Sequence, residues 1–169
     1  MKRMRILKLS TTVVGLGLVL VLSASGSSAQ TAKDLIGAWL TVSVAVDQGD
    51  KKLEPFGSDA KGTQIYDASG RFATIVMRGD LPKVASNNMQ TSTAEESLTI
   101  AHGSLAYYGT YTVNEADKTV TVKIEGASFP NFAGTTQTRR FEISGDQLTI
   151  SNPTPAVGSA AKVVLKRAK

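Results

Sequence analysis

The sequence of 169 residues contains no cysteine, one histidine and one tryptophan. Without cysteine the chain has no disulfide, no thiolate nucleophile and no lipid-modified cysteine. One histidine and no cysteine are too few ligands for a zinc site, so no metal is expected. No cofactor is expected either, because the chain lacks a Walker motif and a Rossmann glycine fingerprint. The fold must therefore rely on its apolar core.

Acidic side chains are absent from the first 33 residues, and this explains most of the net charge of +5. Four of the 19 basic side chains lie among the first eight residues, and without them 15 basic side chains face 14 acidic ones, a net charge of +1. The excess of positive charge belongs to the N-terminal segment. It is no argument for nucleic-acid binding, and no nucleic-acid partner is expected.

The N-terminal segment has the three parts of a secretory signal. A basic start is followed by an uncharged apolar run over residues 13–22 and by the small residues Ser27, Ser28 and Ala29. This order predicts a signal peptide over residues 1–29, with cleavage between Ala29 and Gln30. The apolar run is about half of the roughly 20 residues that a membrane-spanning helix needs. We therefore expect a periplasmic or secreted protein without a stable membrane anchor after cleavage.

Alternating apolar and polar residues dominate the remainder, residues 30–169. Leu40, Val42, Val44 and Val46 alternate with small or polar residues and predict a strand with one apolar face. Similar alternation recurs about every ten residues between turn sequences, such as Asp67–Gly70. The pattern predicts an all-β domain, an antiparallel up-and-down β-barrel of about eight or nine strands.

One helix interrupts the strands. Thr93 and Glu96 fit a capping box, and a helix of about ten residues should follow and stop at Gly103 as its C′ residue. His102 near its end is interpreted as a structural residue at the negative helix terminus, with a general base as the alternative. The polar loop over residues 79–92 is interpreted as a lid over the open end of the barrel.

Several short segments, in their order along the chain, resemble the bacterial lipocalin-like domain family. They are Asp34–Trp39 (DLIGAW), Pro55–Gly57 (PFG), Tyr107–Tyr111 (YYGTY), Phe129–Asn131 (FPN) and Gly145–Thr149 (GDQLT). The resemblance covers nearly all of residues 30–169 and implies a lipocalin-like barrel with a lumen or cup. It also implies that Trp39 plugs the closed end and that Arg167 stacks on it. The chain departs from the family pattern at His102, where an acidic or polar residue is usual, and at Phe132, where a second tryptophan is usual.

Aromatic and arginine side chains on the strands are the candidates for a lumen wall. Of the strand tyrosines, Tyr107 and Tyr111 share a face and Tyr108 points the other way; Arg139 and Arg140 also point to opposite faces. The ligand-binding residues predicted from these positions are Tyr66, Phe72, Tyr108, Tyr111 and Arg140. Two alternatives stay open: ordinary strand packing for the tyrosines, and a structural ion pair between Arg140 and Glu142.

These observations favour an exported protein that binds a small, largely apolar molecule in its barrel. One alternative is an isomerase or cyclase, in which an arginine and tyrosine hydroxyls stabilise an enolate of an apolar substrate. A third is an interaction or structural module of the cell envelope that binds no ligand. The sequence favours a binder over an enzyme, and it assigns no catalytic residue.

Overall fold

The computed structural model describes residues 31–48, 51–152 and 160–169. The predicted signal peptide, its cleavage point, and most of the turn at residues 48–50 and of the Pro-rich loop at residues 152–158 lie outside these ranges. No helix in the part of the chain that the structure describes is long and apolar enough to cross a bilayer.

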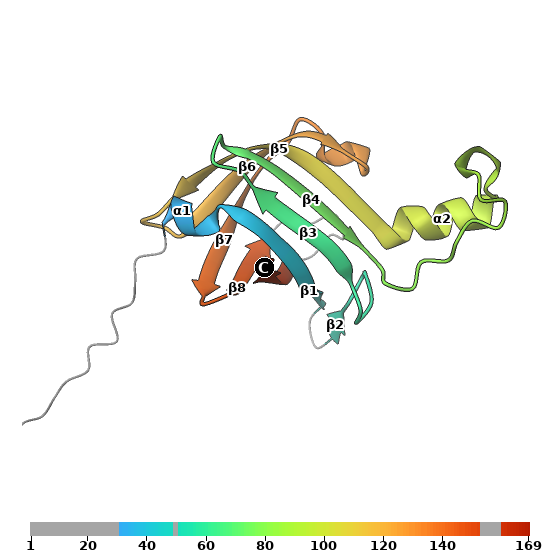
Figure 1. The fold of residues 1–169 in the computed structure, drawn as a ribbon, viewed down its shortest axis with the longest axis horizontal. Helices are drawn as coiled ribbons and strands as arrows, with labels where there is room; N and C mark the ends of the chain where they lie inside the picture. The colour runs from blue at the N-terminus through green and yellow to red at the C-terminus, as the bar shows by residue number, and fades with distance from the viewer. Residues whose placement is uncertain (1–30, 49–50, 153–159) are drawn as a thin grey trace, which may run out of the picture.

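Most of the described residues belong to nine antiparallel strands, and helices are few and short (Figure 1). The strands are β1 (Gly37–Gln48), β2 (Lys51–Leu53), β3 (Lys61–Tyr66), β4 (Arg71–Met77), β5 (Ser104–Asn114), β6 (Thr119–Ala127), β7 (Thr136–Ser144), β8 (Gln147–Asn152) and β9 (Ala161–Arg167). The helices are α1 (Ala32–Leu35), α2 (Ala94–Gly103) and two 3₁₀ turns, η1 (Met89–Thr91) and η2 (Pro130–Phe132).

Eight of the strands close into a barrel. Each strand from β3 to β9 pairs with its neighbour in sequence, and β1 pairs with β3 at one edge and with β9 at the other. The short strand β2 is an addition, since it pairs only with the far end of β1. The predicted antiparallel up-and-down barrel is therefore confirmed, with one extra strand outside the closed cylinder.

The prediction of one apolar face along β1 is wrong. Leu40 and Val42 are half exposed, at 50% and 51%, whereas Val44 and Val46 are buried in the barrel. The register with β9 shifts between Thr41 and Ser43, which marks a β-bulge. A bulge inserts one residue into a strand and so reverses which side chains face inward beyond it. The apolar alternation continues through the bulge, but the face that it occupies changes.

The helix prediction is confirmed at its start and corrected at its end. The Thr93 hydroxyl accepts a hydrogen bond from the Glu96 amide at 3.2 Å, and the Glu96 carboxylate accepts one from the Thr93 amide at 2.8 Å. Gly103 is the last helical residue and not a left-handed C′ residue. A Cβ at Gly103 would lie 2.6 Å from Leu81 Cδ2, so a larger residue there would require the Leu81 side chain to shift.

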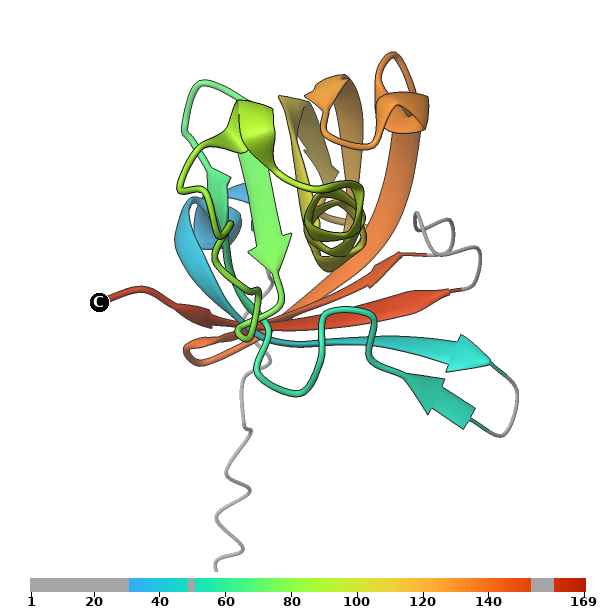
Figure 2. The same cartoon turned by 90° about the vertical axis from the view of Figure 1, so that its right-hand side faces the viewer.

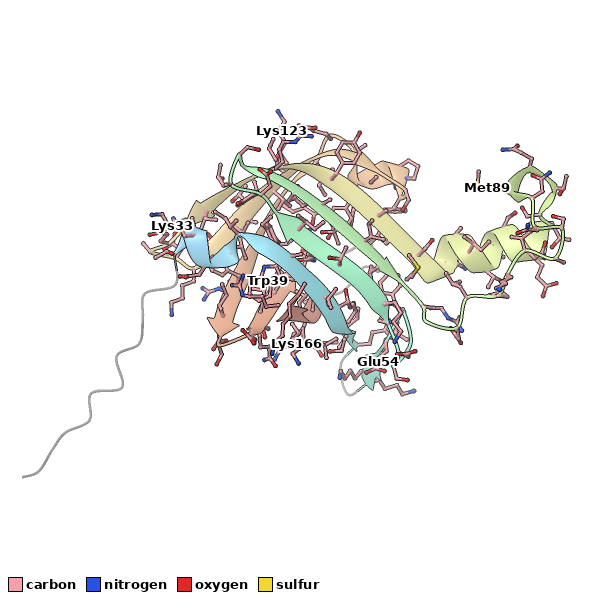
Figure 3. All side chains as sticks on the ribbon, in the orientation of Figure 1. Lys33, Trp39, Glu54, Met89, Lys123 and Lys166 are labelled. Atoms are coloured by element: carbon pink, nitrogen blue, oxygen red, sulfur yellow. The ribbon has the colours of Figure 1, made fainter. Side chains whose placement is uncertain are left out.

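The barrel has two different ends. The α1 turn lies at one end, and α2 extends away from the barrel at the other (Figures 1 and 2). Met89 lies at the tip of the segment that precedes α2, far from the strands (Figure 3). Buried side chains from all eight barrel strands face the interior between these ends.

Candidate functional site

The end of the barrel beside α1 is closed by the side chain of Trp39. This ring is fully buried, and its Nε1 donates a hydrogen bond to the carbonyl oxygen of Leu35 at 2.9 Å. The guanidinium of Arg167 lies 4.0 Å from the centre of the indole ring, within the range of a cation–π contact. Arg167 also donates to the carbonyl oxygens of Asp34, at 2.6 Å, and Ile36, at 3.1 Å. Trp39 and Arg167 thus occupy the places that the family resemblance implied.

Aromatic rings form a connected series across the interior. Tyr66 contacts Phe72 and Tyr111, with ring centres 6.3 and 5.0 Å away, and Phe72 contacts Tyr107 at 5.9 Å. Phe132 from η2 completes the series, with its centre 5.7 Å from that of Tyr107. The Tyr66–Phe72 pair is stacked and the other three contacts are edge-to-face, both of which are arrangements that aromatic pairs prefer. The series ends at Tyr107 and Phe132, which form an aromatic wall of the adjacent cavity.

A cavity lies between this aromatic wall and the opposite strands. Its empty volume is about 670 Å³, including the part that is open to solvent. Most of its lining is apolar, with a smaller polar group. The lining residues are Thr41, Val44, Val46, Pro55, Phe56, Gln64, Thr74, Val76, Leu105, Tyr107, Phe132, Arg139, Ile150, Asn152, Ala161 and Val163. A mainly apolar lining with a few polar groups is typical of a site for one small molecule.

Phe56 covers part of the cavity from the loop between β2 and β3. It is 7% exposed and packs in a cluster with Val44, Ala60 and Val76. Because this loop does not belong to the closed sheet, Phe56 can move without breaking the barrel's strand pairing. The β2–β3 loop therefore contributes Pro55 and Phe56 to the lining from outside the closed sheet.

Arg139 is the centre of the polar part of the lining. Its side chain is 2% exposed, and it donates to the Tyr107 hydroxyl at 3.0 Å and to the Gln137 side-chain oxygen at 2.7 Å. The Asn152 amide donates to the same oxygen of Gln137 at 3.4 Å. Two buried polar atoms nearby, Arg139 Nε and Thr74 Oγ1, have no hydrogen-bond partner in the structure. The cavity thus combines apolar walls with one cation whose hydrogen bonding is incomplete.

Two tyrosine hydroxyls, those of Tyr66 and Tyr111, have raised pKa values. Burial raises the pKa of Tyr66 far above its usual value, and burial followed by the charge of Asp67 raises the pKa of Tyr111. The Tyr66 hydroxyl donates to the Gln64 side-chain oxygen at 3.3 Å, and the Tyr111 hydroxyl donates to the Asp67 carbonyl oxygen at 2.8 Å. Both hydroxyls therefore serve as donors within the fold.

Three of the five predicted ligand-binding residues face the interior. Tyr66 and Phe72 are buried, and Tyr111 is partly buried against the same core cluster. None of the three is among the residues that line the cavity; their rings connect to Tyr107, which does line it. Ligand contact by these residues stays a prediction.

The expectation that Tyr108 and Arg140 face the interior is wrong. Tyr108 is 52% exposed, and its ring lies on the outer face of the sheet, over the position that a Cβ atom of residue Gly126 would occupy. Arg140 is exposed on the outer face of β7, and the described ion pairs do not include one with Glu142. Strand alternation is the reason, because it turns Tyr107 and Arg139 inward and their neighbours outward.

The sequence did contain a signal for Arg139. The apolar residues Phe141 and Ile143 follow it at intervals of two, and this phase places Arg139 on the inner face of β7. Phe56 and Phe132 had no such signal, because they lie in a loop and a 3₁₀ turn without periodicity. Gln64, Thr74 and Asn152 were missed because polar residues on a strand are normally assigned to its outer face.

The segment predicted as a lid does not cover the cavity. The lining contains no residue from 79–92, and α2 extends away from the barrel (Figure 1). His102 is exposed on α2 and is not part of the lining. Roles for this loop and for His102 in ligand binding are therefore not supported by the arrangement seen here.

Comparison with known proteins agrees with the fold. The sequence profile described as a lipocalin-like domain matches residues 36–164. A 4'-hydroxy-3'-methoxypropiophenone carrier protein of Aspergillus oryzae is 35% identical over 88 residues, which are 48% of this chain and 79% of that protein. By its fold, its closed end and these matches, the chain belongs to the lipocalin-like domain family.

Proposed function

We propose that this chain is an exported protein that binds one small, largely apolar molecule inside its barrel. The cavity inside the barrel, with mainly apolar walls and a few polar groups, is the observation that carries the proposal. The lipocalin-like barrel and a relative that is called a carrier protein support a ligand-binding role. That relative's name refers to one small organic molecule, and the proposal for this chain is limited to the class of ligand.

Export is the part of the proposal that rests on the sequence alone. The basic start, the short apolar run and the small residues before Gln30 support it. Fractionation of the producing cells, followed by N-terminal sequencing, tests it. We expect the protein in the periplasm or the medium, with Gln30 as its first residue. Recovery of the uncleaved chain from the cytoplasm contradicts export.

Binding is tested with the processed protein and an uncharged dye, Nile red. Native mass spectrometry should detect a co-purified molecule or a one-to-one complex with the dye, and dye fluorescence should rise on binding. If neither signal is found, the proposed function is wrong.

A pair of neighbouring substitutions locates the dye. Val76 lines the cavity and is 6% exposed, whereas Ile75 on the same strand points outward and is 42% exposed. We expect Val76→Phe to fill part of the cavity and weaken dye binding at least about tenfold, since added volume in a packed interior costs roughly 1–3 kcal/mol. The matched variant Ile75→Phe should bind as the unmodified protein does. Equal effects of the two variants would place the dye on the outer surface.

The two alternative functions, an enzyme and a module without a ligand, each require a different arrangement of side chains inside the barrel. An isomerase or cyclase requires a tyrosine or histidine paired with a carboxylate, and no carboxylate or histidine is found among the described residues that line the cavity. A module without a ligand requires a barrel filled by its own side chains. The cavity is the feature that separates a binder from such a module.

A further inference from the structure

The interior of the barrel holds a positive charge that has no ion-pair partner among the described residues. Arg139 is 2% exposed, and both of its hydrogen bonds in the structure go to neutral oxygens, those of Tyr107 and Gln137. All four ion pairs within the described residues involve exposed or half-exposed side chains, and none includes Arg139. A buried guanidinium normally has a carboxylate or phosphate partner, because removing a charge from water is costly.

The groups around Arg139 are short of hydrogen-bond acceptors. A guanidinium has five N–H donors, and two of its hydrogen bonds are accounted for here. The Gln137 oxygen already accepts from both Arg139 and Asn152. Arg139 Nε is buried without a partner, and so is the hydroxyl of Thr74, which also lines the cavity. A molecule that brings an oxygen acceptor into the cavity would relieve this shortage.

The rest of the lining limits what else such a molecule can carry. Arg139 is the one charged side chain among the described residues that line the cavity. One positive charge matches one negative charge, and the remaining walls are mainly apolar, including Val44, Val76 and Ile150. A doubly charged phosphate or a sugar would leave charges or hydroxyls against apolar walls, at a cost in free energy.

We propose that the ligand of this cavity is an organic monoanion, an apolar molecule with one carboxylate or phenolate oxygen that pairs with the guanidinium of Arg139. The apolar part lies against the aliphatic and aromatic walls, and the charged oxygen accepts hydrogen bonds from Arg139. This inference rests on the function proposed above, and it adds the charge of the ligand and the residue that recognises it.

The first experiment compares octanoate with octan-1-ol, which share a chain length but differ in charge. Isothermal titration calorimetry, or displacement of Nile red from the processed protein, measures both affinities. We expect octanoate to bind about 10- to 100-fold more tightly than octan-1-ol, the difference expected for a charge-assisted hydrogen bond. Equal affinities, or tighter binding of the alcohol, overturn the inference. If Nile red binds and octanoate does not, the inference fails but the proposed function stands.

Adjacent arginines provide a matched pair of variants. Arg139→Met removes the inner charge and keeps a long side chain, whereas Arg140→Met removes the exposed charge next to it. We expect Arg139→Met to lose the preference for octanoate while it retains octan-1-ol binding, and Arg140→Met to behave as the unmodified protein. Equal loss of both ligands in Arg139→Met, or loss of the preference in Arg140→Met, contradicts recognition by Arg139.

A third variant allows the inference to be tested even if Arg139→Met does not fold. Arg139→Lys keeps the positive charge and should retain a preference for octanoate, weaker than that of arginine because lysine lacks the bidentate fork. Far-ultraviolet circular dichroism of each variant verifies the strand content. Should Arg139→Met fail to fold, absence of the octanoate preference in a folded Arg139→Lys variant would still count against the inference.

Discussion

At the scale of single residues, Trp39 has the densest set of contacts at the closed end of the barrel. It is fully buried, hydrogen-bonded to Leu35 and covered by the guanidinium of Arg167. The contacts join α1, β1 and β9, the elements at which the two edges of the sheet meet. Loss of this one side chain should therefore weaken the closure of the barrel as well as its core.

We predict that Trp39→Ala lowers the free energy of unfolding by about 3–5 kcal/mol, the usual cost of truncating a buried aromatic side chain. Urea denaturation followed by circular dichroism measures the change, since the substitution removes the protein's one tryptophan. Leu40→Ala is the control, because Leu40 is adjacent but 50% exposed, and it should cost much less. An unchanged midpoint for Trp39→Ala would show that the indole does not close the barrel.

The contrast between Arg139 and Arg140 shows how far the sequence determines the site. Strand alternation places the two arginines on opposite faces of the sheet, but it does not show which of the two residues faces the interior. Phe141 and Ile143 supply that information, because apolar side chains at the same phase must face the core. Residues such as Phe56 could not be placed in this way, since their position depends on tertiary packing of a loop.

At the scale of elements, the strands and turns were predictable and their irregularities were not. The up-and-down order of the antiparallel strands was predicted correctly, and so was the capping box of α2. The bulge in β1 was not foreseen, because Val42 continues the apolar period on both sides of it. A second register shift, at Tyr108 and Gly109 in the pairing of β5 with β6, left no mark in the sequence pattern either.

Within α2, Glu96 connects the helix to the polar loop that precedes it. Its carboxylate accepts hydrogen bonds from the amides of Ala85 and Thr93, both at 2.8 Å. These bonds, that from Ala85 first, lower the pKa of Glu96 from its ordinary value of 4.5. A carboxyl whose pKa is lowered by folding stabilises the folded state above its unfolded pKa, and this contribution is lost as the pH falls through the folded pKa.

We therefore predict that the loop separates from α2 in acid. Hydrogen-exchange protection factors of the Ala85 and Thr93 amides should be constant near neutral pH and fall as the pH drops below about 4.5, the value from which the Glu96 pKa is lowered. Glu96→Gln should remove this pH dependence, and Glu95→Gln, at the exposed neighbouring position, should preserve it. Protection that persists through the acid range would show that the carboxylate does not hold the loop.

At the scale of the whole molecule, the barrel is closed at one end, and a loop outside the closed sheet borders its cavity. Trp39 and Arg167 close the end beside α1, and Phe56 covers the cavity from the loop between β2 and β3. The alternating strands and the turn sequences predicted the barrel. The sequence predicted the wrong cover, residues 79–92, because length and polarity indicate a mobile loop but not where that loop lies in space.

The position of Phe56 gives a kinetic prediction for the whole molecule. A ligand that enters the cavity must pass the cluster of Phe56, Val44, Ala60 and Val76, so these contacts must open before the ligand leaves. We expect Phe56→Ala to raise the dissociation rate of Nile red at least about tenfold, a change that corresponds to roughly 1.4 kcal/mol of lost contacts. Stopped-flow dilution of the dye complex measures this rate.

The control is Leu53→Ala, which removes an exposed apolar side chain from the neighbouring β2 strand and should leave the rate unchanged. If the two variants release the dye equally fast, the ligand takes another route out of the barrel and the β2–β3 loop is only part of the wall.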